Sequence, residues 1–181
     1  MPKSSQKKIE EDEKKVALAL QKNARESVDA IGKHCGFSRQ KVWRIIKRLE
    51  KNKTIWGYSG IIDDELLDIK KYQILVKRDA SIITSDVLDV VFKRKLDKIA
   101  ENNDVDLESS LLTHGPYDWM FTVNAPNIVK VKKFIEAFQK ILGKYVERID
   151  ILEVLFPVKS NGIVNPNIKS LKEYFPESKK D

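Results

Sequence analysis

The chain has 181 residues, a net charge of +7 and 41% hydrophobic residues, a composition typical of one or two small folded domains and not of intrinsic disorder. No run of about 18 uncharged apolar residues is present, so no membrane span is expected. The polar residues 1–8 predict a flexible arm and no secretory signal. A single cysteine, Cys35, excludes an internal disulfide and cannot alone form a cysteine-based metal site. We therefore expect a cytoplasmic protein without a cofactor or a membrane partner.

The positive charge is concentrated in the first third of the chain. Residues 1–62 carry 15 basic and 7 acidic side chains, whereas residues 63–158 carry 14 and 17. Two domains with different partners follow from this asymmetry. We assign residues 1–62 to a basic domain, 63–71 to an acidic linker, 72–158 to a second domain and 159–181 to a polar tail.

The basic domain begins with three helical segments. The first is expected over Glu10–Lys22, and Ser27 can cap a second helix that Gly36 would end. Ser38 then caps a third helix over Arg39–Asn52. A short helix, a tight turn and a longer helix form the helix-turn-helix pattern, which is common in DNA-binding proteins.

The third helix separates apolar from basic side chains. Its apolar residues recur at helical spacing, and the opposite face carries Gln40, Arg44, Lys47 and Lys51. Between Gly36 and Lys53 there are seven basic residues and one acid, Glu50, which favours DNA over an ordinary solvated face. We expect base contacts from Ser38, Arg39, Gln40 and Arg44 and phosphate contacts from Lys41, Lys47, Arg48, Lys51 and Lys53. For Trp43, packing at the edge of the domain is favoured over stacking on DNA.

The segment after the third helix predicts a ribbon. Thr54–Ile62 places β-prone residues around two glycines, which suggests a short wing. The acidic stretch Asp63–Asp68 then marks either the linker or the end of the ribbon.

The second domain alternates strands and helices in the order βαββαβ. The expected elements are a strand Tyr72–Val76, a helix Asp86–Ala100, a strand Val105–Thr113, a turn His114–Asp118, a strand Trp119–Asn124, a helix Asn127–Leu142 and a strand Tyr145–Val158. This order predicts a ferredoxin-like antiparallel sheet with two helices, so the fold class is α+β. The tail has one short possible helix around Ile168–Tyr174.

Several motifs together resemble the Lrp/AsnC family of leucine-responsive, feast/famine transcription regulators. In the basic domain they are Leu20–Arg25, Ser27, Ile31, Gly36–Ser38, Val42, Lys47–Glu50, Ile55 and Gly57–Tyr58. In the second domain, Gly115–Asp118 matches the Gly-x-x-Asp turn of the family's RAM/ACT-like domain. The resemblance implies binding of double-stranded DNA at palindromic sites, and dimers that pair sheet to sheet and often assemble into tetramers or octamers. Ser109, Trp119 and Met120 are candidates for the pairing surface.

The resemblance also implies a small effector, commonly an amino acid, near the Gly-x-x-Asp turn. His114, Gly115 and Asp118 are the candidate effector residues. Gly115 would let the backbone approach the ligand, and Asp118 could pair with an α-amino group. Capping of its own turn is an equal reading for Asp118.

Departures from the family pattern leave two alternatives open. The family often has an arginine at the position of Ile45 and a threonine at that of His114, and this tail is longer. Loss of the arginine is compatible with an effector-sensing module that no longer binds DNA. An enzyme like the siroheme decarboxylases, which share the two-part arrangement, is the other alternative. Because no catalytic triad, phosphate loop or His-x-x-x-His spacing occurs, we expect a protein that is not an enzyme.

Overall fold

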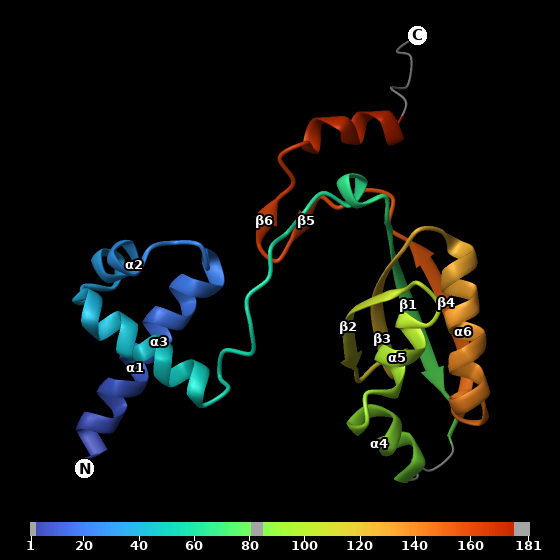
Figure 1. Ribbon diagram of the computed structural model, residues 1–181, viewed down its shortest axis with the longest axis horizontal. Coiled ribbons are helices and arrows are strands. Elements are labelled where there is room, and N and C mark those ends of the chain that lie inside the picture. Colours follow the sequence, from blue (N-terminus) through green and yellow to red (C-terminus); the bar gives the residue numbers. More distant parts are fainter. Residues whose placement is uncertain (1–2, 81–84, 176–181) are drawn as a thin grey trace. The chain divides into compact units, whose positions relative to one another are not determined.

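A computed structural model describes residues 3–80 and 85–175 of the chain. The chain divides into two compact units, Met1–Ile61 and Ile62–Asp181 (Figure 1).

The first unit is built from three helices, α1 (Lys3–Lys22), α2 (Val28–Cys35) and α3 (Arg39–Lys51). Ser27 caps α2 by accepting the N–H of Ala30 at 3.2 Å, and Gly36 ends it in the left-handed region at φ 70°. These features confirm the predicted helix-turn-helix. The flexible arm is wrong from Lys3 onward, because α1 already begins there. Lysine and glutamine are good helix formers, so the segment extends the helix instead of leaving it.

One apolar cluster holds the three helices together. Its buried members, each at most 4% exposed, are Val16, Ile31, Val42, Ile45 and Leu49. Gly32 lets the turn pass close to α2. A Cβ at Gly32 would lie 2.7 Å from the carbonyl oxygen of Phe37, whose N–H donates to the oxygen of Gly32 at 2.8 Å. The helix-turn-helix angle is therefore fixed by backbone contact as well as by side-chain packing.

The predicted ribbon over Thr54–Ile62 is not formed, because none of these described residues is in a strand. The N–H groups of Thr54 and Ile55 instead donate to the oxygen of Leu49, at 2.9 and 3.2 Å, which closes the end of α3. Ile55 packs on the apolar cluster. Two-stranded ribbons are marginal by themselves, so this short segment follows α3 as irregular chain.

The second unit is a four-stranded antiparallel sheet in the order β2-β3-β1-β4. Its strands are β1 (Lys70–Arg78), β2 (Asp106–Leu112), β3 (Trp119–Ala125) and β4 (Val146–Glu153). Its helices are α4 (Ser85–Phe92), α5 (Lys95–Glu101) and α6 (Ile128–Leu142), with short 3-10 turns η1 (Asp64–Leu67) and η2 (Gly143–Tyr145). The strand order is that of the predicted ferredoxin-like domain.

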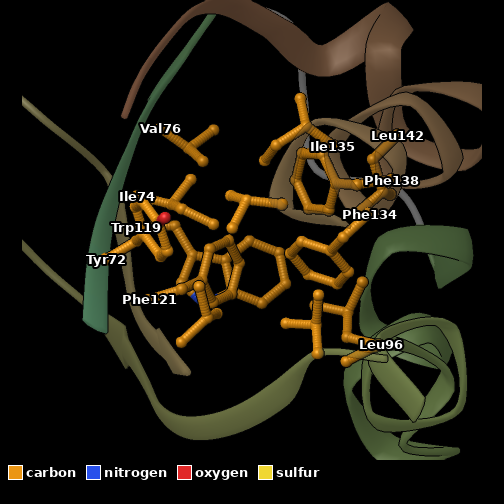
Figure 2. Packing of buried hydrophobic residues seen from close by; sticks show 14 of the residues in the cluster. Tyr72, Ile74, Val76, Leu96, Trp119, Phe121, Phe134, Ile135, Phe138 and Leu142 are labelled. Carbon is orange, nitrogen blue, oxygen red and sulfur yellow. The ribbon is translucent and has the colours of Figure 1, made fainter. Parts of the chain in front are cut away.

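Aromatic side chains fill the space between the sheet and its helices (Figure 2). Alternate residues of β1 and β3 point into this core, and α6 contributes Phe134 and Phe138. Trp119 packs against Phe121 and Phe138, with ring centroids 4.8 and 6.1 Å apart. Trp119 is therefore a core residue, 8% exposed, and not part of the opposite face where a pairing surface was expected. Met120, its neighbour, points to that opposite face because side chains alternate along a strand.

The single helix expected over residues 86–100 is two helices. Arg94 adopts a left-handed conformation at φ 48° between α4 and α5. The break changes which side chains are buried. Val90 and Leu96 enter the core, whereas Phe92 is 76% exposed. A uniform helical period across this break therefore gives the wrong face.

The segment after β4 has structure of its own. The last strand ends at Glu153, and not at Val158 as expected. A small hairpin follows, formed by β5 (Lys159–Ser160) and β6 (Ile163–Val164), and then η3, a 3-10 helix over Ile168–Tyr174. The predicted short helix is thus present in 3-10 form. The rings of Phe156 and Tyr174 lie 5.8 Å apart, so apolar contacts hold this part of the tail.

Candidate nucleic-acid interface

The side of α3 that faces away from the core carries an exposed set of polar and aromatic side chains. We call this set the recognition face; it consists of Gln40, Trp43, Arg44, Lys47 and Lys51. Val42, Ile45 and Leu49 are buried on the opposite side. The period of the sequence produces this division, because residues three and four apart share a helix face. The face presents hydrogen-bond donors, positive charge and one indole to solvent.

The beginning of α3 is fixed by local contacts. The Oγ of Ser38 accepts the N–H of Lys41 at 3.3 Å, so Ser38 serves as the helix cap. Arg39 donates from Nη1 to Asp29 on α2 at 2.9 Å. A shallow hollow at this end of the helix is lined by Arg39, Gln40, Trp43 and Arg44. Trp43 is 55% exposed, so it is only partly packed at the edge of the domain.

Two of the predicted phosphate-contacting residues connect α3 to α1. The Nζ of Lys41 lies 2.7 Å from a carboxylate oxygen of Asp12, and the Nε of Arg48 lies 2.5 Å from one of Glu13. The sequence alone does not predict these pairs. Opposite charges on two helices of one small unit were the available signal.

Glu50, the one acidic residue between Gly36 and Lys53, pairs with a third basic residue, Lys47. Its carboxylate accepts Lys47 Nζ at 2.9 Å and the hydroxyl of Tyr58 at 3.2 Å. The hydrogen bond from Lys47 lowers the pKa of Glu50, and the same bond raises the pKa of Lys47. Both groups are therefore charged at neutral pH, and Lys47 points its charge at Glu50 in the absence of a polyanion.

Three further basic residues that were predicted to contact DNA have no acidic partner in the described part of the chain. Arg44 has only a long contact, from Nε to the carbonyl oxygen of Gln40 at 3.4 Å. Arg44, Lys51 and Lys53 form no ion pair with any residue in 3–80 or 85–175. These three side chains are the ones most available to an external anion.

Ile45 belongs to the core of the first unit, where it is 4% exposed. A residue in this position cannot extend into solvent toward DNA. Its identity therefore gives no reason to think that DNA binding was lost, and this was the only support for that alternative.

The Gly-x-x-Asp turn places the three candidate effector residues differently. Asp118 Oδ2 accepts the backbone N–H of Arg78 at 2.9 Å and lies 3.4 Å from Lys77 Nζ. The hydrogen bond from Arg78 lowers the pKa of Asp118. His114 and Gly115 are exposed. Neither forms a hydrogen bond or ion pair with another residue in the described part of the chain. Asp118 thus joins the turn to β1, a structural role different from the expected capping of its own turn.

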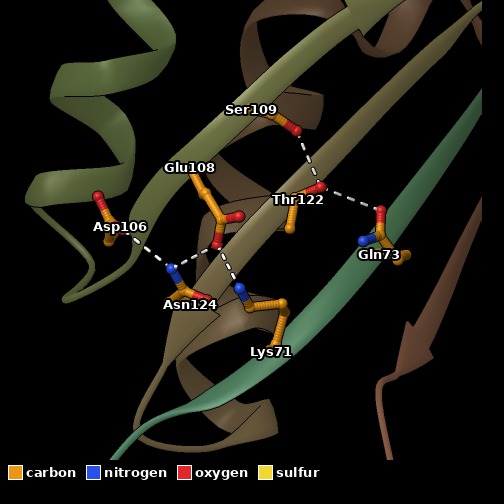
Figure 3. Close-up of polar contacts among 7 residues, drawn as sticks. All are labelled: Lys71, Gln73, Asp106, Glu108, Ser109, Thr122 and Asn124. Carbon is orange, nitrogen blue, oxygen red and sulfur yellow. Dashed lines mark hydrogen bonds and ion pairs between the residues drawn. The ribbon is translucent and has the colours of Figure 1, made fainter. Parts of the chain in front are cut away.

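The sheet face opposite the helices is polar at its centre (Figure 3). Ser109 donates to Thr122 at 2.8 Å, and Thr122 donates to Gln73 at 3.2 Å, across three strands. A second group consists of Lys71, Asp106, Glu108 and Asn124. The Nδ2 of Asn124 donates to both Asp106 and Glu108, at 3.0 and 3.1 Å. These side chains form a hydrogen-bonded surface on this face of the sheet.

Residues 3–80 and 85–175 also lack features typical of two other protein classes. No helix there is both long and apolar enough to cross a membrane. No group of three or more His, Cys, Asp or Glu side chains that could hold a metal occurs there. The two histidines lie in different units; His34 Nδ1 is 3.1 Å from Glu26.

Part of the first unit is similar to a known class of DNA-binding domain. Residues 14–55 match the family model described as winged helix-turn-helix DNA-binding. No curated protein matches the chain in sequence.

The fold of most of the chain is similar to that of solved transcription regulators, among them proteins named as AsnC family and feast or famine regulators, which agrees with the predicted fold. A transcriptional regulator of Neisseria meningitidis, solved with L-methionine, is 17% identical, has a TM-score of 0.61, and the match covers 86% of this chain and 96% of that one. An AsnC family regulator of Agrobacterium tumefaciens is 18% identical, with a TM-score of 0.57 and coverage of 91% and 97%. A feast or famine regulatory protein of M. tuberculosis, also with L-methionine, is 15% identical, with a TM-score of 0.60 and coverage of 83% and 94%.

Proposed function

We propose that this protein is a cytoplasmic transcriptional regulator of the Lrp/AsnC type that binds specific DNA sequences and is not an enzyme. The recognition face carries the proposal. It combines an available guanidinium at Arg44, an amide at Gln40 and a free ammonium at Lys51 on one exposed helix side. Arginine and glutamine make bidentate pairs with guanine and adenine in the major groove, and lysine neutralises phosphates.

We propose that α3 enters the major groove with its N-terminal half nearest the bases. Gln40 and Arg44 then face base edges, and Ser38 and Arg39 lie beside them at the N-terminal end of α3. Lys51 and Lys53, at the other end of the helix, reach phosphates. Lys47 contributes only in part, because Glu50 competes with the phosphate for its ammonium group. Lys41 and Arg48 lie between the acidic side chains of α1 and the DNA backbone and contact both.

The active form is proposed to be a dimer, or a larger assembly of dimers, that reads palindromic sites. The polar sheet face of the second unit supports this, because groups at its centre such as Thr122 and Gln73 are only half-buried in the single chain. Two helix-turn-helix units related by a two-fold axis would bind two half-sites arranged as an inverted repeat.

An amino-acid effector is proposed as the regulatory ligand. Its support is the Gly-x-x-Asp turn and the L-methionine named with two proteins of the same fold. The exposed Gly115 and His114 are the contact candidates, whereas Asp118 would act mainly by holding the turn on β1. Calorimetry with each standard amino acid tests this: heat that disappears in Gly115→Val supports it, and no heat with any amino acid removes it.

In vitro selection from random-sequence duplexes tests the proposed function. The expected result is enrichment of one motif with two-fold symmetry. Protein that binds all duplexes equally, or none, would contradict sequence-specific regulation. A tetrapyrrole absorption band on the purified protein would instead favour the enzyme alternative.

A further inference from the structure

We infer that Trp43 makes an apolar contact with the C5-methyl group of a thymine and so helps determine which sequence is bound. This inference rests on the proposed function, since it places the recognition face in the major groove. It adds a contact that neither charge nor hydrogen bonding supplies.

The exposure of Trp43 is the starting observation. Its side chain is 55% exposed and lies outside the apolar cluster of the first unit, whereas Trp119 in the second unit is 8% exposed. Single exposed apolar residues are common on protein surfaces. Trp43 differs in its position, because it lies between the polar groups of the recognition face.

The neighbours of Trp43 define what the indole can contact. The hollow at the start of α3 is lined by this indole together with Arg39, Gln40 and Arg44. The ion pair with Asp29 anchors Arg39 on one side, whereas Arg44 makes only a long contact from its Nε to the Gln40 carbonyl oxygen, at 3.4 Å. More than half of the Trp43 surface therefore remains exposed between side chains that can hydrogen-bond to neighbouring bases.

The chemistry of the groove selects the partner. Every base edge in the major groove presents hydrogen-bond donors or acceptors, and the thymine methyl is its apolar group. An indole has one N–H donor but a large apolar surface. Burying this surface against a methyl is favourable, whereas burying it against a bare amino or carbonyl group leaves that group without a partner.

The Trp43→Ala variant should fold. Trp43 is absent from the core, and alanine has the higher helix propensity. Loss of binding in this variant can therefore be attributed to the missing contact. Trp56→Ala is the matched control, because Trp56 is 94% exposed and follows α3 outside the recognition face.

The test removes the methyl and the indole separately. On the duplex obtained by selection, each thymine is replaced in turn by deoxyuridine, and the dissociation constant is measured for wild type, Trp43→Ala and Trp56→Ala. At one thymine in each half-site, the replacement is expected to weaken binding of the wild-type protein about fourfold. This factor corresponds to about 0.8 kcal/mol per buried CH₂ group. The same replacement should leave the affinity of Trp43→Ala unchanged and should still weaken Trp56→Ala.

Two results would overturn the inference. In one, no deoxyuridine replacement weakens wild-type binding. In the other, the replacement weakens Trp43→Ala by the same factor as wild type, so that methyl and indole are independent. Wild type that selects no sequence at all would contradict the proposed function itself, which separates the two failures.

Discussion

The carboxylate of Asp118 and the backbone N–H of Arg78 form a 2.9 Å hydrogen bond that joins the Gly-x-x-Asp turn to β1. The N–H of Asp118 also donates to the oxygen of Val76 at 2.9 Å. The aspartate of this turn is thus held by a strand distant in sequence. Any effector that contacts the turn would meet a fixed aspartate and exposed neighbours.

Acidification should weaken the second unit through Asp118. The hydrogen bond from Arg78 lowers the pKa of Asp118 below its ordinary value of 3.8. A carboxyl group with a lowered folded-state pKa stabilises the fold above its unfolded pKa, and this contribution is lost as the pH falls through the folded pKa. Urea unfolding at pH 7 and pH 3 should show a smaller acid-induced loss for Asp118→Asn than for wild type. An equal loss in the variant would contradict this role.

The end of α2 should depend on glycine at position 36. Gly36 has φ 70°, a conformation that costs a residue with a Cβ about 1–2 kcal/mol. Gly36→Ala should lower the free energy of unfolding by that amount. Gly57→Ala is the control, since a Cβ at Gly57 would contact nothing within 4 Å and no positive φ occurs there. If the two variants are equally stable, the left-handed cap is not what ends α2.

Glu50 should restrain DNA binding by occupying Lys47. Glu50→Gln removes a negative charge and releases the ammonium that it holds at 2.9 Å. Affinity for DNA should rise, and the slope of log K against log salt should steepen by up to about 1, because one more phosphate contact releases a counterion. Filter binding between 50 and 200 mM salt measures the slope. An unchanged slope would show that Lys47 stays away from the DNA.

Arg48 should serve both α1 and the DNA. Arg48→Ala and Glu13→Gln each break the ion pair between α3 and α1, and each should cost at most about 1 kcal/mol, the usual range for exposed pairs. Only Arg48→Ala should also reduce the salt slope, by about 1. If both variants keep the wild-type slope, Arg48 is a structural residue alone.

The sequence predicts best the elements whose signals are local. Ser27, Gly36 and Ser38 mark helix ends through their own backbone preferences, and β1 and β3 alternate clearly. Arg94 gives no such signal, because arginine rarely adopts a left-handed conformation, so the break between α4 and α5 was missed. Trp119 was misplaced because alternation shows that a strand has two faces but not which one the helices cover. The partners of Lys41 and Arg48 depend on how α1 packs, which no local pattern contains.

Replacement of Arg44 tests the central claim most directly. Arg44→Ala is compared with wild type on the selected duplex and on a scrambled duplex by fluorescence anisotropy, with Lys132→Ala as the control from an exposed position on α6. The account predicts a loss of about 1–3 kcal/mol on the selected duplex for Arg44→Ala, a smaller loss on the scrambled one, and wild-type binding for Lys132→Ala. Equal affinity of Arg44→Ala and wild type for the selected duplex would contradict the claim that the recognition face reads DNA.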